Sequence, residues 1–218
     1  MILSRGRKYL FIHAPKTGGT SMALALEARA MKDDIMLGDT PKALKRRKRL
    51  ADVRTAGRLW KHSTLADLDG LVQPDEIEDL FIFTMVRNPW DRMVSYYHWL
   101  RAQSFEHPVV DLAKRLTFEG FVVERLVAQS FASTPAASYI TDAQGVERKC
   151  LYIRLEHLAQ DIAPLEAHLG FALDVPHVNR SERTNNYRDA YSDEARARVA
   201  EYCAADIARF GYLFEGST

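Results

Sequence analysis

One short stretch, PKTGGTS at residues 15–21, gathers groups that could bind an anion. Adjacent glycines let a backbone turn tightly and bring its N–H groups close to a ligand. The helix-forming run that follows would aim its first N–H groups and its dipole at the same place. Although a glycine pair alone can be an ordinary turn, the nearby ammonium and hydroxyls favour a phosphate site. Its candidate residues are Lys16, Thr17, Gly18, Gly19, Thr20 and Ser21.

The order of these residues differs from that of a nucleoside triphosphate loop. In that pattern, G-x-x-x-x-G-K-[ST], the lysine follows the last glycine. Here Lys16 precedes both glycines and the loop is shorter. A shorter loop can wrap one phosphate group but not easily a β,γ-phosphate tail. The sequence therefore favours a nucleotide with a single 5′ phosphate-like group whose reactive end points toward Lys16.

A second polar group follows the continuous apolar run at residues 80–86. Arg87 would stand at the end of this strand, where an arginine is a good bidentate partner for phosphate. Ser95 lies about two helical turns further along. Two interpretations stay open. Arg87 and Ser95 bind a phosphate, or Arg87 only pairs with Asp91 while Ser95 is merely exposed.

Strand-like and helix-like runs alternate along the chain, which predicts an α/β domain with a mainly parallel sheet. Ligands of such sheets lie at the carboxyl ends of the strands, where both polar groups are expected. We expect a loop at 130–138, and Asn88 and Pro89 mark a helix start. The expected strands are 9–14, 58–62, 80–86 and 149–155. The other expected helices are 20–31, 40–50, 117–128, 158–170 and 192–209.

The composition indicates one globular domain over residues 1–218. Hydrophobic residues make up 47% of the chain and the net charge is +1, which excludes a global attraction to nucleic acid or to a membrane. The two cysteines, Cys150 and Cys203, are expected to be free thiols, which favours a reducing compartment. We see no signal peptide or membrane span, so we expect a cytoplasmic protein. The oligomeric state stays open.

Together, PKTGGTS and VRNPWDRMVSYYH resemble the sulfotransferase family that uses 3′-phosphoadenosine 5′-phosphosulfate (PAPS). The likeness is greatest to its carbohydrate-type branch, the sulfotransferase family 2-like proteins. Later segments resemble further family motifs, and the likeness covers residues 8–215. These segments are YIRLEHLAQD at 152–161, PHVNRSER at 176–183 and IARFGYLF at 207–214. The resemblance implies a three-layer αβα, P-loop-NTPase-like sulfotransferase fold.

The resemblance also implies roles for the candidate residues. The first loop would hold the 5′-phosphosulfate, with Lys16 serving the bridging oxygen between phosphate and sulfate. Arg87 and Ser95 would hold the 3′-phosphate, and Arg183 would touch the nucleotide. The reaction would be in-line transfer of a sulfuryl group to a hydroxyl or amine of an acceptor, such as a carbohydrate or glycoconjugate. No metal would be required.

A base must accept the proton of the acceptor, and His62 is our candidate. It follows a possible strand, and histidine titrates near neutral pH. The matching region of the family often carries the KHS found here at 61–63. A capping or core role is the alternative for His62, and His98 is the second choice of base. His13, inside the first strand, is expected to pack next to the loop.

The segment from Lys42 to Lys61 contains nine Lys or Arg residues and one acid, Asp52. It is either a solvated face or an electropositive rim that steers an anionic glycan acceptor. Nucleic acid is disfavoured because aromatic residues are absent there apart from Trp60. Two other functions remain for the whole chain: a P-loop-type small-molecule kinase and a non-catalytic module that binds anionic glycans.

Overall fold

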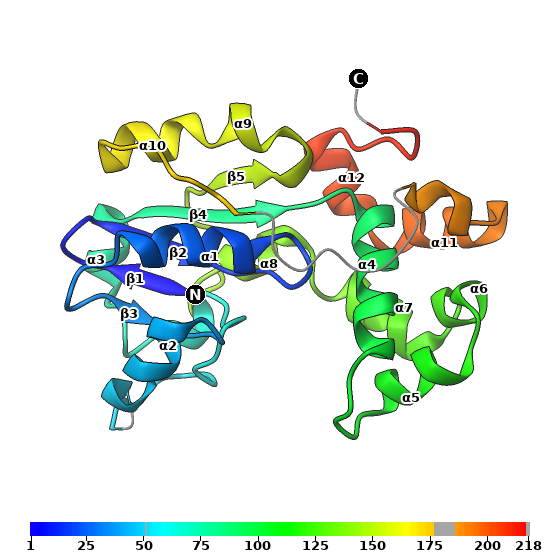
Figure 1. Cartoon of the computed structure of the whole chain (residues 1–218), viewed down its shortest axis with the longest axis horizontal. Coiled ribbons are helices and arrows are strands. Elements are labelled where there is room, and N and C mark those ends of the chain that lie inside the picture. The colour runs from blue at the N-terminus through cyan, green and yellow to red at the C-terminus, as the bar shows by residue number, and fades with distance from the viewer. Residues whose placement is uncertain (51, 177–185, 217–218) are drawn as a thin grey trace. The chain divides into compact units, whose positions relative to one another are not determined.

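The computed structural model describes residues 1–50, 52–176 and 186–216, and the chain divides into two compact units (Figure 1). Unit 1 comprises Met1–Val86 and Ala136–Val178. Unit 2 comprises Arg87–Pro135 and Asn179–Thr218. Each unit is built from two separate stretches of sequence. A single sulfotransferase domain over residues 1–218 stays a prediction.

Unit 1 contains a five-stranded sheet in the order β3-β1-β2-β4-β5. Strand β4 pairs in parallel with β2 on one side and with the edge strand β5 on the other. Strand β1 pairs antiparallel with β2 and with β3. The predicted α/β class with a mainly parallel core is therefore confirmed. The strands are β1 (Ile2–Ser4), β2 (Tyr9–Ile12), β3 (Ile35–Met36), β4 (Phe81–Val86) and β5 (Leu151–Arg154).

Both faces of this sheet are covered by apolar residues. Successive side chains of a strand point to opposite faces, so neighbouring residues of one strand belong to different clusters. In β2, Tyr9 and Phe11 join one apolar cluster and Leu10 and Ile12 join another. The first cluster includes residues of α1 (Gly19–Ala28), α2 (Pro41–Arg46) and α10 (Ala163–Leu169). The second includes residues of η2 (Ala66–Leu68), α3 (Pro74–Asp79) and α8 (Ala136–Ile140). The expected three layers are thus present within unit 1. The short elements η1 (Arg47–Leu50), η3 (Leu155–His157) and α9 (Leu158–Asp161) complete the unit.

Unit 2 is helical in the residues that the structure describes. Its first helix starts as the sequence predicts: Asn88 accepts a hydrogen bond from the Trp90 backbone N–H (3.1 Å), and Pro89 is the first helical residue. The Asn88 amide also donates to the Leu213 carbonyl (2.9 Å), which fixes this turn to the C-terminal segment. The helices are α4 (Pro89–Arg101), α5 (Pro108–Arg115), α6 (Phe118–Val122), α7 (Arg125–Ala132), η4 (Tyr187–Ala190), α11 (Asp193–Tyr202) and α12 (Ala204–Phe210).

Several expected elements differ in detail. Residues 58–62 form no strand, since Ser63 folds the segment into a turn by donating to the Arg58 and Trp60 carbonyls. The helix expected at 117–128 is two helices, α6 and α7, and the one expected at 192–209 breaks at Cys203. Two thirds of the loop expected at 130–138 is helical, because α7 runs to Ala132 and α8 begins at Ala136. The short strands β1 and β3 were not expected.

Both cysteines are free thiols, as predicted. Burial raises the pKa of the Cys203 thiol to about 12, so this group is inert near neutral pH. None of the helices in the described ranges is both long and apolar enough to cross a bilayer.

Candidate active site

The phosphate loop, defined here as residues 15–21, connects β2 to α1 in unit 1. The Thr17 hydroxyl is buried and donates to the Ala14 carbonyl at 2.8 Å, which closes the first turn of the loop. Gly18 then adopts a left-handed backbone with φ 88°, a conformation that favours glycine. Because the Thr17 proton serves Ala14, this residue would present its backbone N–H to a ligand.

Lys16 also has a left-handed backbone, with φ 64°. A residue with a Cβ atom pays about 1–2 kcal/mol for this conformation. Strain of this kind persists where the surrounding structure enforces it and is concentrated at functional sites. The loop thus holds its lysine at an unfavourable backbone angle instead of using a glycine there.

The N-terminus of α1 has the features of an anion site. Gly18 is its N-cap and supplies no side-chain hydrogen bond, and the first turn has no acidic residue. The first N–H groups of a helix have no partner within the helix. The Gly18 carbonyl accepts from Ser21 N (3.0 Å) and Met22 N (3.4 Å), and Thr20 and Ser21 are partly exposed. The residues present therefore fit a phosphate or sulfate group.

Gly19 is required for a different reason from Gly18. A Cβ atom on Gly19 would lie 2.1 Å from Cδ2 of His13, so the histidine ring packs directly against this glycine. His13 is 7% exposed and stacks on Phe11 on the strand (5.7 Å between ring centroids). The expectation that His13 packs next to the loop is confirmed.

His62 lies beside His13. The two ring centroids are 4.6 Å apart with an interplanar angle of 73°, and Nδ1 of His62 is 2.7 Å from the His13 carbonyl oxygen. Since a carbonyl oxygen only accepts, Nδ1 carries the proton and Nε2 is the unprotonated nitrogen. Burial lowers the pKa of His62 to about 4, although the bond to the His13 carbonyl opposes this. His62 is thus neutral at pH 7, with a lone pair on Nε2.

The turn that carries His62 is held by its neighbour Ser63. This fully buried side chain donates to the Arg58 and Trp60 carbonyls and accepts from the Trp60 N–H (2.9 Å). Thr64 and Asp67 then exchange hydrogen bonds that begin the next helical turn. The position of His62 is therefore set on both sides along the chain.

The second predicted anchor lies in unit 2. Nε and Nη2 of Arg87 contact Oδ2 of Asp91 at 2.7 and 2.6 Å, so the pairing considered in the sequence analysis does occur. Ser95, however, is only 6% exposed and is not the surface residue of that alternative. Within the described ranges its hydroxyl has no hydrogen-bond partner. A fixed guanidinium just before α4 and a buried hydroxyl within α4 are compatible with phosphate binding.

Two other candidates have different outcomes. Arg183 lies outside the described residues. His98, on α4 in unit 2, is partly exposed and makes an edge contact with Tyr97 (5.4 Å).

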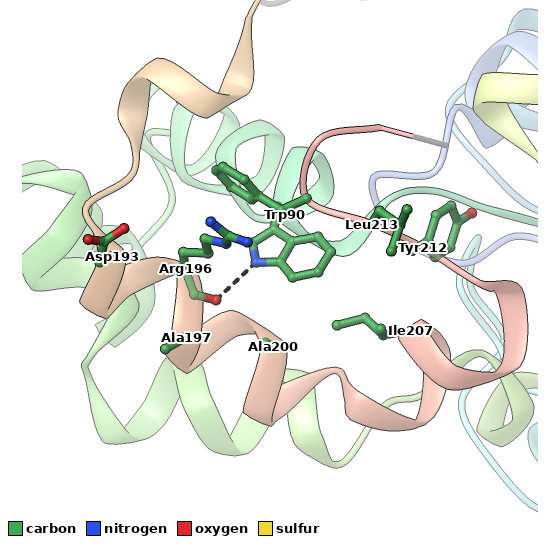
Figure 2. A pocket seen from close by; sticks show the side chains of 9 residues that line it. Trp90, Asp193, Arg196, Ala197, Ala200, Ile207, Tyr212 and Leu213 are labelled. Carbon is green, nitrogen blue, oxygen red and sulfur yellow. Dashed lines mark hydrogen bonds between the residues drawn. The ribbon is translucent and has the colours of Figure 1, made fainter. Parts of the chain in front are cut away.

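Unit 2 also contains a pocket of about 410 Å³ that does not include Arg87 or Ser95 (Figure 2). The Trp90 indole N–H donates to the Arg196 carbonyl at 3.0 Å, and the Arg196 guanidinium lies 4.6 Å from the Phe214 ring centroid. These contacts tie α4 to α11 and to the C-terminal segment, so they explain the shape of unit 2. The pocket is lined by Trp90, Asp193, Arg196, Ala197, Ala200, Ile207, Tyr212, Leu213 and Phe214.

Seven of the nine cations between Lys42 and Lys61 fall into two groups; of the other two, Arg58 lies over the Trp60 ring and Lys61 pairs with Asp39. The first group, Lys42, Arg46 and Arg49, donates to the carbonyls of Glu27, Asp34 and Lys32 at 2.6, 3.1 and 2.6 Å. These cations stabilise the chain after α1. The second group, which we call the outward cations, is exposed, and its side chains form no hydrogen bond or ion pair within the part of the chain described. It comprises Lys45, Arg47, Lys48 and Arg54.

Unit 1 thus brings together the phosphate loop, His13 and His62. Unit 2 contains Arg87, just before α4, and Ser95 within α4. The contact between His13 and His62 was missed from the sequence. These residues are 49 positions apart, and no motif spacing connects them.

Comparison with known proteins agrees with the motifs. A model of the sulfotransferase family matches residues 1–213. A crystal structure of mouse sulfotransferase SULT7A1 complexed with PAP is similar at 17% identity and a TM-score of 0.44, covering 94% of this chain and 66% of that chain. This chain therefore spans slightly less than two thirds of that protein. None of the curated proteins matches. Since the family model covers nearly the whole sequence, the chain belongs to the sulfotransferase family.

Proposed function

We propose that this protein transfers a sulfuryl group from PAPS to a hydroxyl or amine of an acceptor, by in-line displacement. The observation that carries the proposal is the start of α1, whose N-terminus has neither a side-chain cap nor an acidic residue. Lys16 directly precedes it and is held with a left-handed backbone. Membership of the sulfotransferase family supports the same reaction.

The phosphate loop would hold the 5′-phosphosulfate end. PAPS supplies the sulfuryl group and the leaving phosphate. The backbone N–H groups of residues 17–20 and the Thr20 and Ser21 hydroxyls would bind the equatorial oxygens, while the Ser21 N–H already donates to the Gly18 carbonyl. The Lys16 ammonium would neutralise the charge that develops on the leaving phosphate. Fixed donors of this kind accelerate such transfers by positioning and electrostatics.

Arg87 and Ser95 would hold the 3′-phosphate, and Arg183 would also touch the nucleotide. The Asp91 carboxylate keeps the Arg87 guanidinium in one orientation, which lowers the entropy cost of binding. The buried Ser95 hydroxyl would gain a partner when phosphate binds. These features of Arg87 and Ser95 support their proposed role as the contacts of the 3′-phosphate.

His62 would accept the proton of the acceptor through Nε2. The bond from Nδ1 to the His13 carbonyl leaves this nitrogen unprotonated, and burial keeps the ring neutral at pH 7. A neutral imidazole is the form that a general base requires. Its hydrogen bond to a fixed backbone atom orients the ring.

For the acceptor we propose a carbohydrate or glycoconjugate with negative charge. The outward cations support this, because they offer exposed charge that no described residue neutralises. A cytoplasmic location is part of the proposal and agrees with the two free thiols.

A thermal titration tests the proposal. Adenosine 3′,5′-bisphosphate, the product of the reaction, should raise the melting temperature more than ATP with magnesium does. A larger shift with ATP and magnesium would contradict the proposal and would favour a P-loop-type kinase. A glycan-binding module without catalysis would instead retain glycan binding but give no transfer of labelled sulfate from PAPS.

A further inference from the structure

The His13 imidazole lies between the phosphate loop and the candidate base. On one side it packs against Gly19, where an added Cβ atom would come within 2.1 Å of Cδ2. On another side it meets the His62 ring edge to face, 4.6 Å between centroids. Phe11 on β2 stacks on it at 5.7 Å. All four residues belong to unit 1.

The backbone of His13 acts on His62 as well. Its carbonyl oxygen is 2.7 Å from Nδ1 of His62, so it selects the tautomer in which Nε2 is free of a proton. The ring of His13 would restrict the His62 ring from turning away from this carbonyl, because the two rings are in edge contact, His13 is buried and His62 is half-buried. One residue therefore contacts both the anion loop and the base.

We propose that His13 is a positioning residue whose ring fixes His62 relative to the phosphate loop and holds it in the tautomer that accepts a proton at Nε2. The inference rests on the proposed function in one respect: it takes His62 to be the base. The effect of the His13 ring on the orientation and tautomer of His62 does not depend on the proposed function.

The charges around this pair favour two neutral rings. Lys61 faces both histidines, Lys16 faces His13, and Asp39 faces His62 while pairing with Lys61 at 2.5 Å. The α-amino group of Met1 also faces both, but burial lowers its own pKa to about 4, so it is neutral at pH 7. Burial, followed by these nearby positive charges, lowers the pKa of His13 well below its ordinary value. Neutral rings can pack edge to face without the repulsion that two imidazolium groups would suffer.

The first test reads the tautomer of His62 directly, by ¹⁵N NMR of the full chain between about pH 5 and 8, on either side of the ordinary histidine pKa. In the wild type we expect the Nδ1–H form throughout. In His13→Ala we expect a mixture of tautomers and titration closer to the ordinary 6.5. His13→Phe keeps a ring of similar size and should keep the wild-type signals.

His168→Ala is the matched control. This imidazole also stacks on a phenylalanine, Phe81 (4.5 Å), and contacts a backbone carbonyl, that of Arg7 (2.9 Å). Its loss should lower stability without changing the His62 signals. Unchanged His62 signals in His13→Ala, or an equal change in His168→Ala, would overturn the proposal.

Kinetics separate positioning from general damage. We expect His13→Ala to lower kcat by about 10- to 100-fold, the effect of misplacing a reacting group by an ångström or less, while KM for PAPS changes far less. A fall in kcat/KM that came only from KM would overturn the proposal. If the wild type transferred no sulfuryl group while the NMR result held, the proposed function would fail and the coupling of the histidines would stand.

A double-mutant cycle tests the contact with Gly19. Gly19→Ala should reduce the thermal shift given by adenosine 3′,5′-bisphosphate, because the new methyl group displaces the His13 ring. Adding His13→Ala removes the clash and should restore much of this shift, so the two changes are not additive. If the two substitutions reduced the thermal shift additively, the assigned contact between His13 and Gly19 would be overturned. This measurement needs no enzymatic turnover.

Discussion

Lys8 and Lys16 flank strand β2 and share a left-handed backbone, with φ 51° and φ 64°. They are the non-glycine residues with positive φ in the part of the chain that the structure describes. Lys8 closes the turn between β1 and β2, where its N–H donates to the Arg5 carbonyl (3.2 Å). Lys16 belongs to the phosphate loop. The same backbone strain thus occurs once in a structural turn and once in the candidate site.

Replacing either lysine with glycine should relieve this strain. We expect Lys16→Gly and Lys8→Gly to stabilise the fold by about 1 kcal/mol each, as measured by chemical denaturation. Of these two variants, Lys16→Gly should abolish sulfuryl transfer, because it removes the ammonium from the loop, and Lys8→Gly should not. Lys16→Ala, which keeps a Cβ atom, should lose activity without the gain in stability. Equal activity of Lys16→Gly and Lys8→Gly would contradict the role of Lys16.

Arg87→Ala should remove the recognition of the 3′-phosphate. We expect affinity for adenosine 3′,5′-bisphosphate to fall by about 10-fold or more, because a bidentate, charge-assisted contact is lost. Affinity for adenosine 5′-monophosphate, which has no 3′-phosphate, should hardly change. Arg87→Lys should recover only part of the loss, since an ammonium lacks the planar fork. Calorimetry with both nucleotides checks this, and an equal loss for both would refute the assignment.

The sequence allows some parts of this architecture to be predicted better than others. The helix start at Asn88 and the turn at Gly18 follow from local chemistry, so both were predicted correctly. Strands β1 and β3 are only three and two residues long and exist because neighbouring strands pair with them. The approach of His13 to His62 depends on how the end of β2 packs against the turn at Ser63. The two segments are far apart in the sequence, so local sequence patterns do not predict this packing.

His62→Gln should separate chemistry from nucleotide binding. Without the imidazole there is no neutral Nε2 to accept the proton, so we expect kcat to fall by about 100-fold or more. The shift in melting temperature with adenosine 3′,5′-bisphosphate should be retained, because His62 is not part of the phosphate loop. Turnover at the wild-type rate would exclude His62 as the base and direct attention to His98.

The stability of the fold should depend on pH through the buried histidines. Because burial lowers the pKa of His62 from 6.5 to about 4, the unfolded chain binds more protons than the folded one between these values. The contribution of His62 to stability should therefore be complete above pH 6.5 and fall by about 1.4 kcal/mol per pH unit as the pH drops toward 4. The carboxylates with lowered pKa, Asp142 and Asp161, add losses only below their ordinary 3.8.

Denaturation curves at several pH values check this. His62→Gln should flatten the decline between pH 6.5 and about 4, leaving the part due to His13. A slope that His62→Gln does not alter would show that its imidazole remains ordinary in the fold.

The outward cations should govern the capture of an anionic acceptor. We expect the triple variant Lys45→Ser, Arg47→Ser, Lys48→Ser to raise KM for a sulfated or uronate glycan by about 10-fold at low salt, with kcat unchanged. The difference should shrink as added salt screens the charges. Arg46→Ser is the control. It removes a cation that donates to the Asp34 carbonyl, so it should lower the melting temperature and leave KM close to the wild-type value. Equal KM values for the triple variant and the wild type would remove the acceptor role.

The interrupted order of unit 1 has a consequence for synthesis on the ribosome. Strand β4 pairs with β2 on one side and with β5 on the other, and the residues of β5 emerge only after Arg87–Pro135 has been translated. During that interval the nascent chain carries an apolar strand with one open edge, the kind of surface on which two growing chains can join. Until β5 has been synthesised, this edge of β4 therefore has no partner strand within the chain.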